Sequence, residues 1–258
     1  MRFATWNVNS LKVRQERVEQ WLTDISPDVV CMQETKLADD AFPQLAFEAL
    51  GYSAVHHGEG RWNGVAVLSR RGVDSVSFGF DDGEEPDSEA RLMTAQAAGM
   101  TILNVYVPNG RALDADHYQY KLRWLDRLAK HLDTVATDGS PVIIAGDFNI
   151  APADVDVYDP AAFVGATHVS EPERDRLRAL LDRGLTDVFR HRYPDATRAF
   201  SWWDYRRGDF HEGRGMRIDL VLASAPVVDR VEWVVIDRNA RKGQLPSDHA
   251  PIVVDLRD

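Results

Sequence analysis

The chain has 258 residues, of which 44% are hydrophobic and 28% are charged, values close to those of an average globular protein. This composition excludes a disordered chain and a coiled coil, and the single cysteine, Cys31, excludes a framework of disulfides. No apolar run approaches the length that spans a membrane, and the first residues do not have the pattern of a signal peptide. We therefore expect a cytoplasmic protein with no membrane partner.

The charge is strongly negative, because 41 acidic residues face 30 basic ones and give a net charge of −11. By itself this excess argues against a nucleic-acid partner, since phosphate binding depends on lysine and arginine. The segment Asp81–Glu89, however, carries six acids and no base, so the rest of the chain is only mildly acidic. The segment Arg190–Arg217 holds seven arginines, four acids and interleaved aromatic residues, and is either a basic surface for nucleic acid or a solvated loop.

In chain order, short runs rich in apolar and β-branched residues predict strands along the whole length. The predicted strands are Arg2–Val8, Val29–Gln33, Ser53–His57, Val65–Ser69, Ser75–Phe80, Arg91–Ala97, Thr101–Val107, Val142–Asp147, Ile218–Ala223, Val231–Ile236 and Pro251–Leu256. The acidic segment Asp81–Glu89 falls between two of these strands, and we expect it to be a mobile surface loop.

Three helices are predicted from apolar residues that recur every three or four positions, at Tyr118–Leu132, Val18–Ile25 and Leu177–Leu181. Strands outnumber helices, and neither a linker nor a repeat of fixed period divides the chain. We predict one α/β (α+β) domain over residues 1–258, with two β-sheets packed face to face and helices on their outer sides.

Polar side chains that β propensity would not select follow several of the predicted strands. These residues are Asn7, Asn9, Glu34, Tyr106, Asn109, Asp147, Asn149, Asp219, Asp248 and His249. Each has an ordinary structural explanation as a helix cap, a turn residue or a surface group. Taken together, they predict one polar cleft, because strand ends that share an edge of packed sheets usually carry the site.

The chemistry of these side chains predicts a divalent cation. Several carboxylates brought together without a lysine or arginine would repel one another unless a cation neutralised them. The available ligands are oxygens and one imidazole, with no cysteine cluster, and this set favours Mg²⁺ or Mn²⁺ over a structural zinc ion.

Seven motifs in order connect the chain to a known family. They are WNVNSL at 6–11, QETK at 33–36, NVYVPNG at 104–110, GDFN at 146–149, SWWDYR at 201–206, RID at 217–219 and SDHAP at 247–251. In these motifs the chain resembles the exonuclease III family of AP endonucleases, within the endonuclease/exonuclease/phosphatase superfamily. The resemblance implies the DNase I-like fold, a four-layer α/β sandwich.

The resemblance also implies a ligand set for Mg²⁺, with Mn²⁺ as a substitute. Glu34 would be the principal metal ligand, with Asn7 close by and Asp248 as a further ligand or a supporting group. Whether one metal ion or two are bound stays open at this point.

Five further residues receive roles from the same resemblance. Asp147 would orient or deprotonate the attacking water, and Asn149 would hold that water or the scissile phosphate. His249, kept protonated by Asp219, would stabilise charge on the phosphate, and Tyr106 would contact the phosphate or assist the leaving group. Depending on metal occupancy, Asp147, Asn149 and His249 would serve as ligands instead.

Contacts to DNA are implied for residues outside this catalytic set. Trp202, in the segment that ends at Arg206, would form a wall of the pocket for an extrahelical abasic sugar. Many family members carry tryptophan where this chain has Met216, and a flexible thioether specifies the shape of a pocket less rigidly.

Four other residues are predicted to meet phosphates or the minor groove. Asn109 and Arg111 follow Tyr106 closely in the sequence, and Arg91 and Lys121 complete the set. With Arg206, these basic side chains would give DNA affinity its dependence on salt.

The sequence thus predicts a Mg²⁺-dependent DNA repair nuclease, acting as a monomer on double-stranded DNA. The resemblance implies cleavage 5′ to abasic sites, 3′-to-5′ exonuclease activity and trimming of 3′ ends. Two alternatives stay open: another phosphodiesterase of the superfamily that acts on RNA or a lipid phosphate, and a non-catalytic DNA-binding relative. The balance of the nuclease activities is not decided by the sequence.

Overall fold

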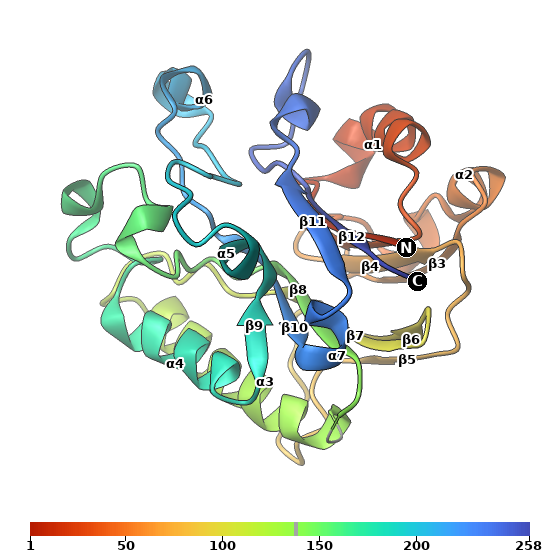
Figure 1. The fold of residues 1–258 in the computed structure, drawn as a ribbon, viewed down its shortest axis with the longest axis horizontal. Helices are drawn as coiled ribbons and strands as arrows, with labels where there is room; N and C mark the ends of the chain where they lie inside the picture. The colour runs from red at the N-terminus through yellow and green to blue at the C-terminus, as the bar shows by residue number, and fades with distance from the viewer. Residues whose placement is uncertain (137–138) are drawn as a thin grey trace.

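The computed structural model describes residues 1–136 and 139–258, which form two β-sheets of six strands each (Figure 1). The strands of the first sheet, in spatial order, are β11 (Val231–Ile236), β12 (Ile252–Leu256), β1 (Arg2–Asn7), β2 (Val29–Gln33), β4 (Val65–Ser69) and β3 (Ser53–His57). Those of the second are β5 (Ser75–Phe78), β6 (Leu92–Ala97), β7 (Met100–Tyr106), β8 (Val142–Asp147), β10 (Asp219–Ser224) and β9 (Leu185–Asp187).

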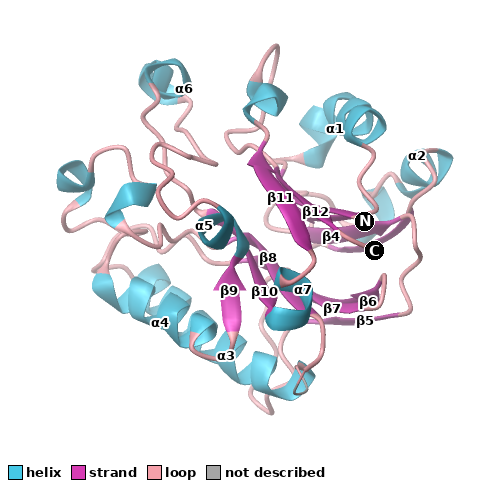
Figure 2. Ribbon diagram, viewed as in Figure 1, coloured by secondary structure: helices cyan, strands magenta, loops and turns pink. Residues whose placement is uncertain are grey.

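Helices cover the outer faces of both sheets (Figure 2). The α-helices are α1 (Leu11–Ile25), α2 (Gln44–Ala49), α3 (Asp116–Val135), α4 (Glu171–Leu181), α5 (Val188–Arg192), α6 (Asp209–Glu212) and α7 (Ala225–Val228). Alternate side chains of the strands fill the space between the sheets, while the other face of each sheet packs on α1 and α2 or on α3 and α4. The predicted four-layer sandwich is confirmed.

All eleven predicted strands are present, with ends that differ by at most two residues. The sequence analysis missed β9, whose three residues are too few for a recognisable alternation. It also began the first helix too late, because α1 starts at Leu11, where the segment's apolar face begins. Among the described residues, no helix combines the length and apolar character needed to cross a membrane.

Parallel strand pairs direct the polar strand ends of both sheets to one edge. Strand β1 runs parallel to β2, and β7 runs parallel to β8, so Asn7 pairs with Gln33 and Tyr106 pairs with Asp147. The sheets are joined near this edge by a buried hydrogen bond of 2.7 Å from Gln33 Nε2 to Asn104 Oδ1. This hydrogen bond fixes the position of the β1–β2 pair relative to the β7–β8 pair.

The acidic segment Asp81–Glu89 is attached to helix α3. Asp82 accepts two hydrogen bonds from Arg127, and Glu84 pairs with Lys130. The helix therefore neutralises part of the loop's charge, so the loop is a packed part of the surface.

The arginine-rich segment Arg190–Arg217 is only partly a basic surface. Arg217 is fully buried and forms ion pairs with Asp156 and Asp187, and Arg190 also pairs with Asp156. We call these four side chains the arginine cluster. Two of the seven arginines thus neutralise buried carboxylates rather than facing a partner.

Candidate functional site

Three side chains from distant parts of the sequence meet at the shared edge of the sheets. Glu34 follows β2, Asp147 ends β8 and His249 precedes β12, and each offers a ligand atom within 4.8 Å of the others. Together with Asp219 at the start of β10, they are called the catalytic cluster below. The sequence therefore correctly predicted that these strand ends converge.

Asn7 bridges two of the three carboxylates of the cluster. Its amide nitrogen donates to Glu34 Oε1 at 2.8 Å and to Asp147 Oδ2 at 2.9 Å. The amide oxygen accepts from the backbone nitrogen of Asn9 at 3.0 Å. In this arrangement the amide nitrogen of Asn7 donates to the carboxylates. The sequence analysis had instead expected Asn7 to belong to the ligand set of a metal.

Asp219 holds the imidazole of His249. The Nδ1 atom of His249 lies 2.8 Å from Asp219 Oδ2, and its Nε2 atom lies 3.7 Å from Asp147 Oδ2. Ser201 Oγ accepts from the backbone nitrogen of Asp219 at 3.0 Å and so fixes the start of β10. Burial disfavours the charged imidazole, but Asp219 and Asp147 raise the pKa of His249 to about 10.

The two remaining carboxylates of the cluster have opposite pKa shifts. Burial, together with the charges of Asp219 and Glu34, raises the pKa of Asp147 to about 7. Burial also opposes ionisation of Glu34, yet Lys36 and Asn7 hold its pKa below the usual value. The Lys36 ammonium lies 2.8 Å from Glu34 Oε2, so Lys36 is a site residue that the sequence analysis quoted in a motif but left without a role.

Tyr106 ends β7 beside the catalytic cluster. Burial and the Glu34 carboxylate raise the pKa of its phenol well above the usual value, so the phenol is neutral. The Arg91 guanidinium lies 4.5 Å from the centre of the Tyr106 ring and pairs with Glu89. Only 7% of Arg91 is exposed, and its guanidinium contacts Tyr106 and Glu89, while the contact of Arg91 with DNA stays a prediction.

Asn149 lies next to Asp147 with its amide held on both sides. Its Nδ2 donates to the carbonyl of Val107 at 2.9 Å, and its Oδ1 accepts from Asn109 Nδ2 at 3.1 Å. His168 Nε2 lies 3.1 Å from the same Oδ1. Burial and the Lys121 charge lower the pKa of His168 to about 4, so its ring is neutral near pH 7.

Lys121 is also placed differently from the expectation. Both its side chain and that of Glu173 are fully buried, and the two form an ion pair. Lys121 Nζ also donates to the backbone oxygen of Asn149 at 2.7 Å. The prediction that Lys121 contacts DNA is therefore wrong, because it cannot reach solvent and instead supports the loop that carries Asn149.

Asp248 lies beside the catalytic cluster, but both of its oxygens have other partners. Oδ1 accepts from Asn9 Nδ2 at 2.9 Å, and Oδ2 accepts from Trp202 Nε1 at 3.1 Å. This arrangement fits a supporting role, in which Asp248 fixes the indole of Trp202. Trp203, by contrast, is fully buried.

A pocket of about 270 Å³ opens next to Trp202. Met216 and Arg206 line it, and Met216 is almost completely buried. The Arg206 side chain is 84% exposed and pairs with Asp204, while Arg111 is exposed beside Asn109. Arg206 and Arg111 therefore both lie at the surface.

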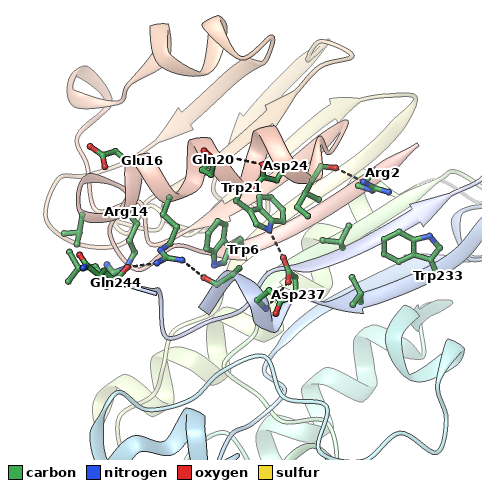
Figure 3. A pocket seen from close by; sticks show the side chains of 18 residues that line it. Arg2, Trp6, Arg14, Glu16, Gln20, Trp21, Asp24, Trp233, Asp237 and Gln244 are labelled. Atoms are coloured by element: carbon green, nitrogen blue, oxygen red, sulfur yellow. Dashed lines mark hydrogen bonds between the residues drawn. The ribbon is translucent and has the colours of Figure 1, made fainter. Parts of the chain in front are cut away.

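A large groove lies elsewhere, between α1 and β11 (Figure 3). It has a volume of about 870 Å³, and Trp21 in its wall donates to Asp237 Oδ2 at 2.9 Å. No member of the catalytic cluster lines it. Size therefore does not identify the site, which is marked by its chemistry.

His168 is the contact of Asn149 that sequence reasoning missed. It comes from the loop before α4, far from every quoted motif, and no periodicity or spacing marks it. The contact between His168 and Asn149 forms because the chain returns to the segment after β8, where the backbone nitrogen of Ala151 donates to the backbone oxygen of His168.

Comparisons with known proteins agree with this geometry. The model of the endonuclease/exonuclease/phosphatase family matches residues 4–249, nearly the whole chain. The chain belongs to this family. It is 33% identical over 268 residues to exodeoxyribonuclease III of Haemophilus influenzae, and the match covers 100% of both proteins. The protein is therefore a member of the exonuclease III family, a phosphodiester-hydrolysing nuclease of DNA repair.

Two solved structures show the same fold. An AP endonuclease from Archaeoglobus fulgidus is 38% identical, with a TM-score of 0.96 and coverage of 99% of each chain. A 3′ phosphatase from Neisseria, bound to a product DNA hairpin, is also 38% identical, with a TM-score of 0.97 and coverage of 100% of each chain. The two relatives carry different activities on one scaffold, so the fold alone does not select between them.

Proposed function

We propose that the protein is a divalent-metal-dependent nuclease that cuts double-stranded DNA 5′ to abasic sites and also removes nucleotides or blocking groups from 3′ ends. The observation that carries this proposal is the catalytic cluster, in which a protonated imidazole and three carboxylates meet at one edge of the sheets. Relatives named as an AP endonuclease and a 3′ phosphatase support both activities.

The donor set fits Mg²⁺, with Mn²⁺ as a substitute. Glu34 and Asp147 offer carboxylate oxygens at one point, and burial, together with the nearby charges of Asp219 and Glu34, raises the pKa of Asp147. Glu34 would be the main ligand, with Asp147 and the oxygen of a reoriented Asn7 beside it. When bound, the metal would supply positive charge to stabilise the phosphate oxygens as negative charge develops on them.

The chain's own residues would handle the water and the phosphate. Asp147, with a pKa of about 7, is suited to accept a proton from the attacking water near neutral pH. Asn149 would position that water or a phosphate oxygen through its amide. His249, which holds its proton because of Asp219, would donate to a non-bridging phosphate oxygen, and a protonated imidazole is a poor metal ligand.

The pocket beside Trp202 would select the substrate. Its volume of about 270 Å³ suits a sugar without a base, and the indole is fixed by its hydrogen bond to Asp248. Arg206, which lines this pocket, and the exposed Arg111 would contact backbone phosphates. Neutral substitution of either arginine is expected to weaken DNA binding and to reduce its salt dependence.

The test uses a duplex oligonucleotide with one tetrahydrofuran abasic analogue, beside a lesion-free duplex with a recessed 3′ end and one with a 3′-phosphate. The wild-type protein should cut 5′ to the analogue in Mg²⁺ or Mn²⁺, stop in EDTA and recover when metal is restored. Asp147→Asn should lose activity by about 10³-fold, within the range of general acid–base groups.

The same assay separates the alternatives. Activity on RNA or a lipid phosphate, with no cleavage of any duplex, would favour another hydrolase of the superfamily. Binding to the duplex without cleavage under any metal condition would identify a non-catalytic DNA-binding relative. Cleavage of the 3′ ends alone would contradict the abasic-site part of the proposal and leave the metal-dependent nuclease intact.

Met216 provides a test of the pocket. A flat and rigid indole in Met216→Trp should alter the ratio of abasic-site cleavage to 3′-end removal by several-fold, because the pocket becomes narrower and better defined. Both rates are measured on the substrates above. Identical ratios for the variant and the wild type would exclude Met216 as a specificity determinant.

A further inference from the structure

We propose that His168 is a positioning residue, which fixes the amide of Asn149 and is itself held by the buried Lys121–Glu173 ion pair. The inference rests on the proposed nuclease function. It concerns a residue that acts on the substrate only through Asn149. It starts from contacts that the family resemblance did not assign.

The hydrogen bonds around the Asn149 amide define its orientation. The carbonyl of Val107 can only accept, so the amide atom 2.9 Å from it must be the Nδ2 donor. The Oδ1 atom then points to His168 Nε2 and to Asn109 Nδ2, each at 3.1 Å. One N–H of Asn149 remains for a water or a phosphate oxygen.

The same contacts determine the tautomer of His168. A neutral ring that carries its proton on Nε2 donates to Asn149 Oδ1, while Nδ1 accepts from Thr167 Oγ1 at 2.7 Å. The opposite tautomer would let Nε2 accept from Asn109 Nδ2, which also lies 3.1 Å away, but it would direct a lone pair at the buried amide oxygen of Asn149. The tautomer with the proton on Nε2 is favoured because the exposed amide of Asn109 can donate to water instead. Thr167 thus orients His168 toward Asn149.

The backbone of His168 is held in place by the ion pair. His168 has a φ of 76°, a left-handed conformation that side-chain-bearing residues keep only when their surroundings impose it. Its N–H donates to Glu173 Oε1 at 3.0 Å, and Lys121 Nζ donates to the backbone oxygen of Asn149 at 2.7 Å. The Lys121–Glu173 ion pair therefore holds both the backbone of His168 and the backbone of Asn149.

The test compares steady-state kcat and KM on the abasic and recessed 3′-end duplexes for the wild type, His168→Ala and His168→Gln, with His191→Ala as the control. His191 is exposed on α5, away from the catalytic cluster. His168→Ala should lower kcat by about 10-fold to 100-fold with KM nearly unchanged, since small displacements of positioning groups have effects of this size. His168→Gln should recover most of the rate, because its amide can still donate.

A double-mutant cycle with Asn149→Ala separates positioning from a general structural effect. If His168 acts through Asn149, His168→Ala should have almost no further effect on kcat in the Asn149→Ala background. Additive losses, or an unchanged kcat for His168→Ala, would overturn the inference. Loss of wild-type cleavage on every duplex would instead overturn the proposed function itself, so the two failures are distinguishable.

Discussion

The catalytic cluster and the arginine cluster are both buried groups of charged side chains, but they are balanced differently. In the arginine cluster, Arg217 and Arg190 face Asp156 and Asp187, and Arg217 lies 2.8 Å from Asp156 and 2.7 Å from Asp187. Two positive charges meet two negative ones. The cluster can therefore stay buried without an external ion.

The catalytic cluster has an excess of negative charge. Glu34, Asp147 and Asp219 face a single imidazolium, His249, and the charges of Asp219 and Glu34 add to the effect of burial in raising the pKa of Asp147. Lys36 at the edge offsets only part of the excess. The contrast indicates that the protein leaves charge unbalanced where a cation is required and balances it where the role is structural.

The largest effect is expected when one partner is removed from a buried ion pair whose charges balance, such as Lys121–Glu173. Lys121→Met should leave the Glu173 carboxylate buried and unpaired, and should lower the free energy of unfolding by about 3–5 kcal/mol. Urea denaturation at pH 7 measures the loss. The matched control is Lys130→Met, because the Lys130 ammonium is exposed on the same helix and pairs with Glu84, so its loss should change the free energy of unfolding far less. Equal losses for the two variants would contradict a distinction between buried and exposed pairs.

The next prediction removes a negative charge from the catalytic cluster itself. Asp219 helps to raise the pKa of His249 to about 10, so Asp219→Asn should let the imidazole lose its proton at lower pH. We expect kcat to fall by about 100-fold at pH 8 and by less at pH 6, where the imidazole of the variant is again protonated.

A pH–rate profile from pH 6 to 10 measures this effect. Asp255→Asn is the control, because Asp255 pairs with Arg2 on a distant part of the first sheet. If the alkaline limb of Asp219→Asn coincided with that of the wild type, Asp219 would not control the protonation of His249.

The convergence of the catalytic cluster could be predicted from the sequence, because polar residues at the ends of apolar strands mark a common edge. Glu34 and Asp147 follow runs of buried residues and are conspicuous there. Asn7 was placed correctly, but the direction of its amide depends on hydrogen bonds that involve two sheets. Such partners become visible only when the strands are assembled.

The error at Lys121 arose because a positive charge was equated with exposure to solvent. Lys121 lies three residues after Tyr118 and four before Leu125 on α3, so helical periodicity places it on the buried face. That signal was present and was not applied. For Arg91 and His168 no comparable signal exists, since their partners lie on other strands or loops.

Metal binding should stabilise the protein through the catalytic cluster. At a Mg²⁺ concentration about tenfold above Kd, the wild type should gain about 1.4 kcal/mol, which corresponds to a Tm increase of about 3 °C for a chain of this size. Glu34→Gln should abolish most of this gain, because it removes a charged ligand.

Thermal unfolding with and without Mg²⁺ measures the shift, with Asp126→Asn as a control. Asp126 is an exposed acid on α3 that pairs with Arg176. A shift of the same size in Glu34→Gln and in the wild type would place the ion outside the catalytic cluster.

The smallest effect is expected at the acidic loop, where cations of α3 already meet the acids. The hydrogen bonds from Arg127 lower the pKa of Asp82 to about 2, so Asp82 stabilises the fold above pH 4 and loses this contribution as the pH falls through about 2. Asp82→Asn should lower the free energy of unfolding by about 1 kcal/mol at pH 7, and the difference from the wild type should shrink between pH 4 and pH 3.

Urea denaturation at these pH values tests the prediction, with Glu85→Gln, an exposed acid of the same loop, as the control. A difference that stayed constant from pH 7 to pH 3 would show that the packing of Asp82, rather than its charge, attaches the loop to α3.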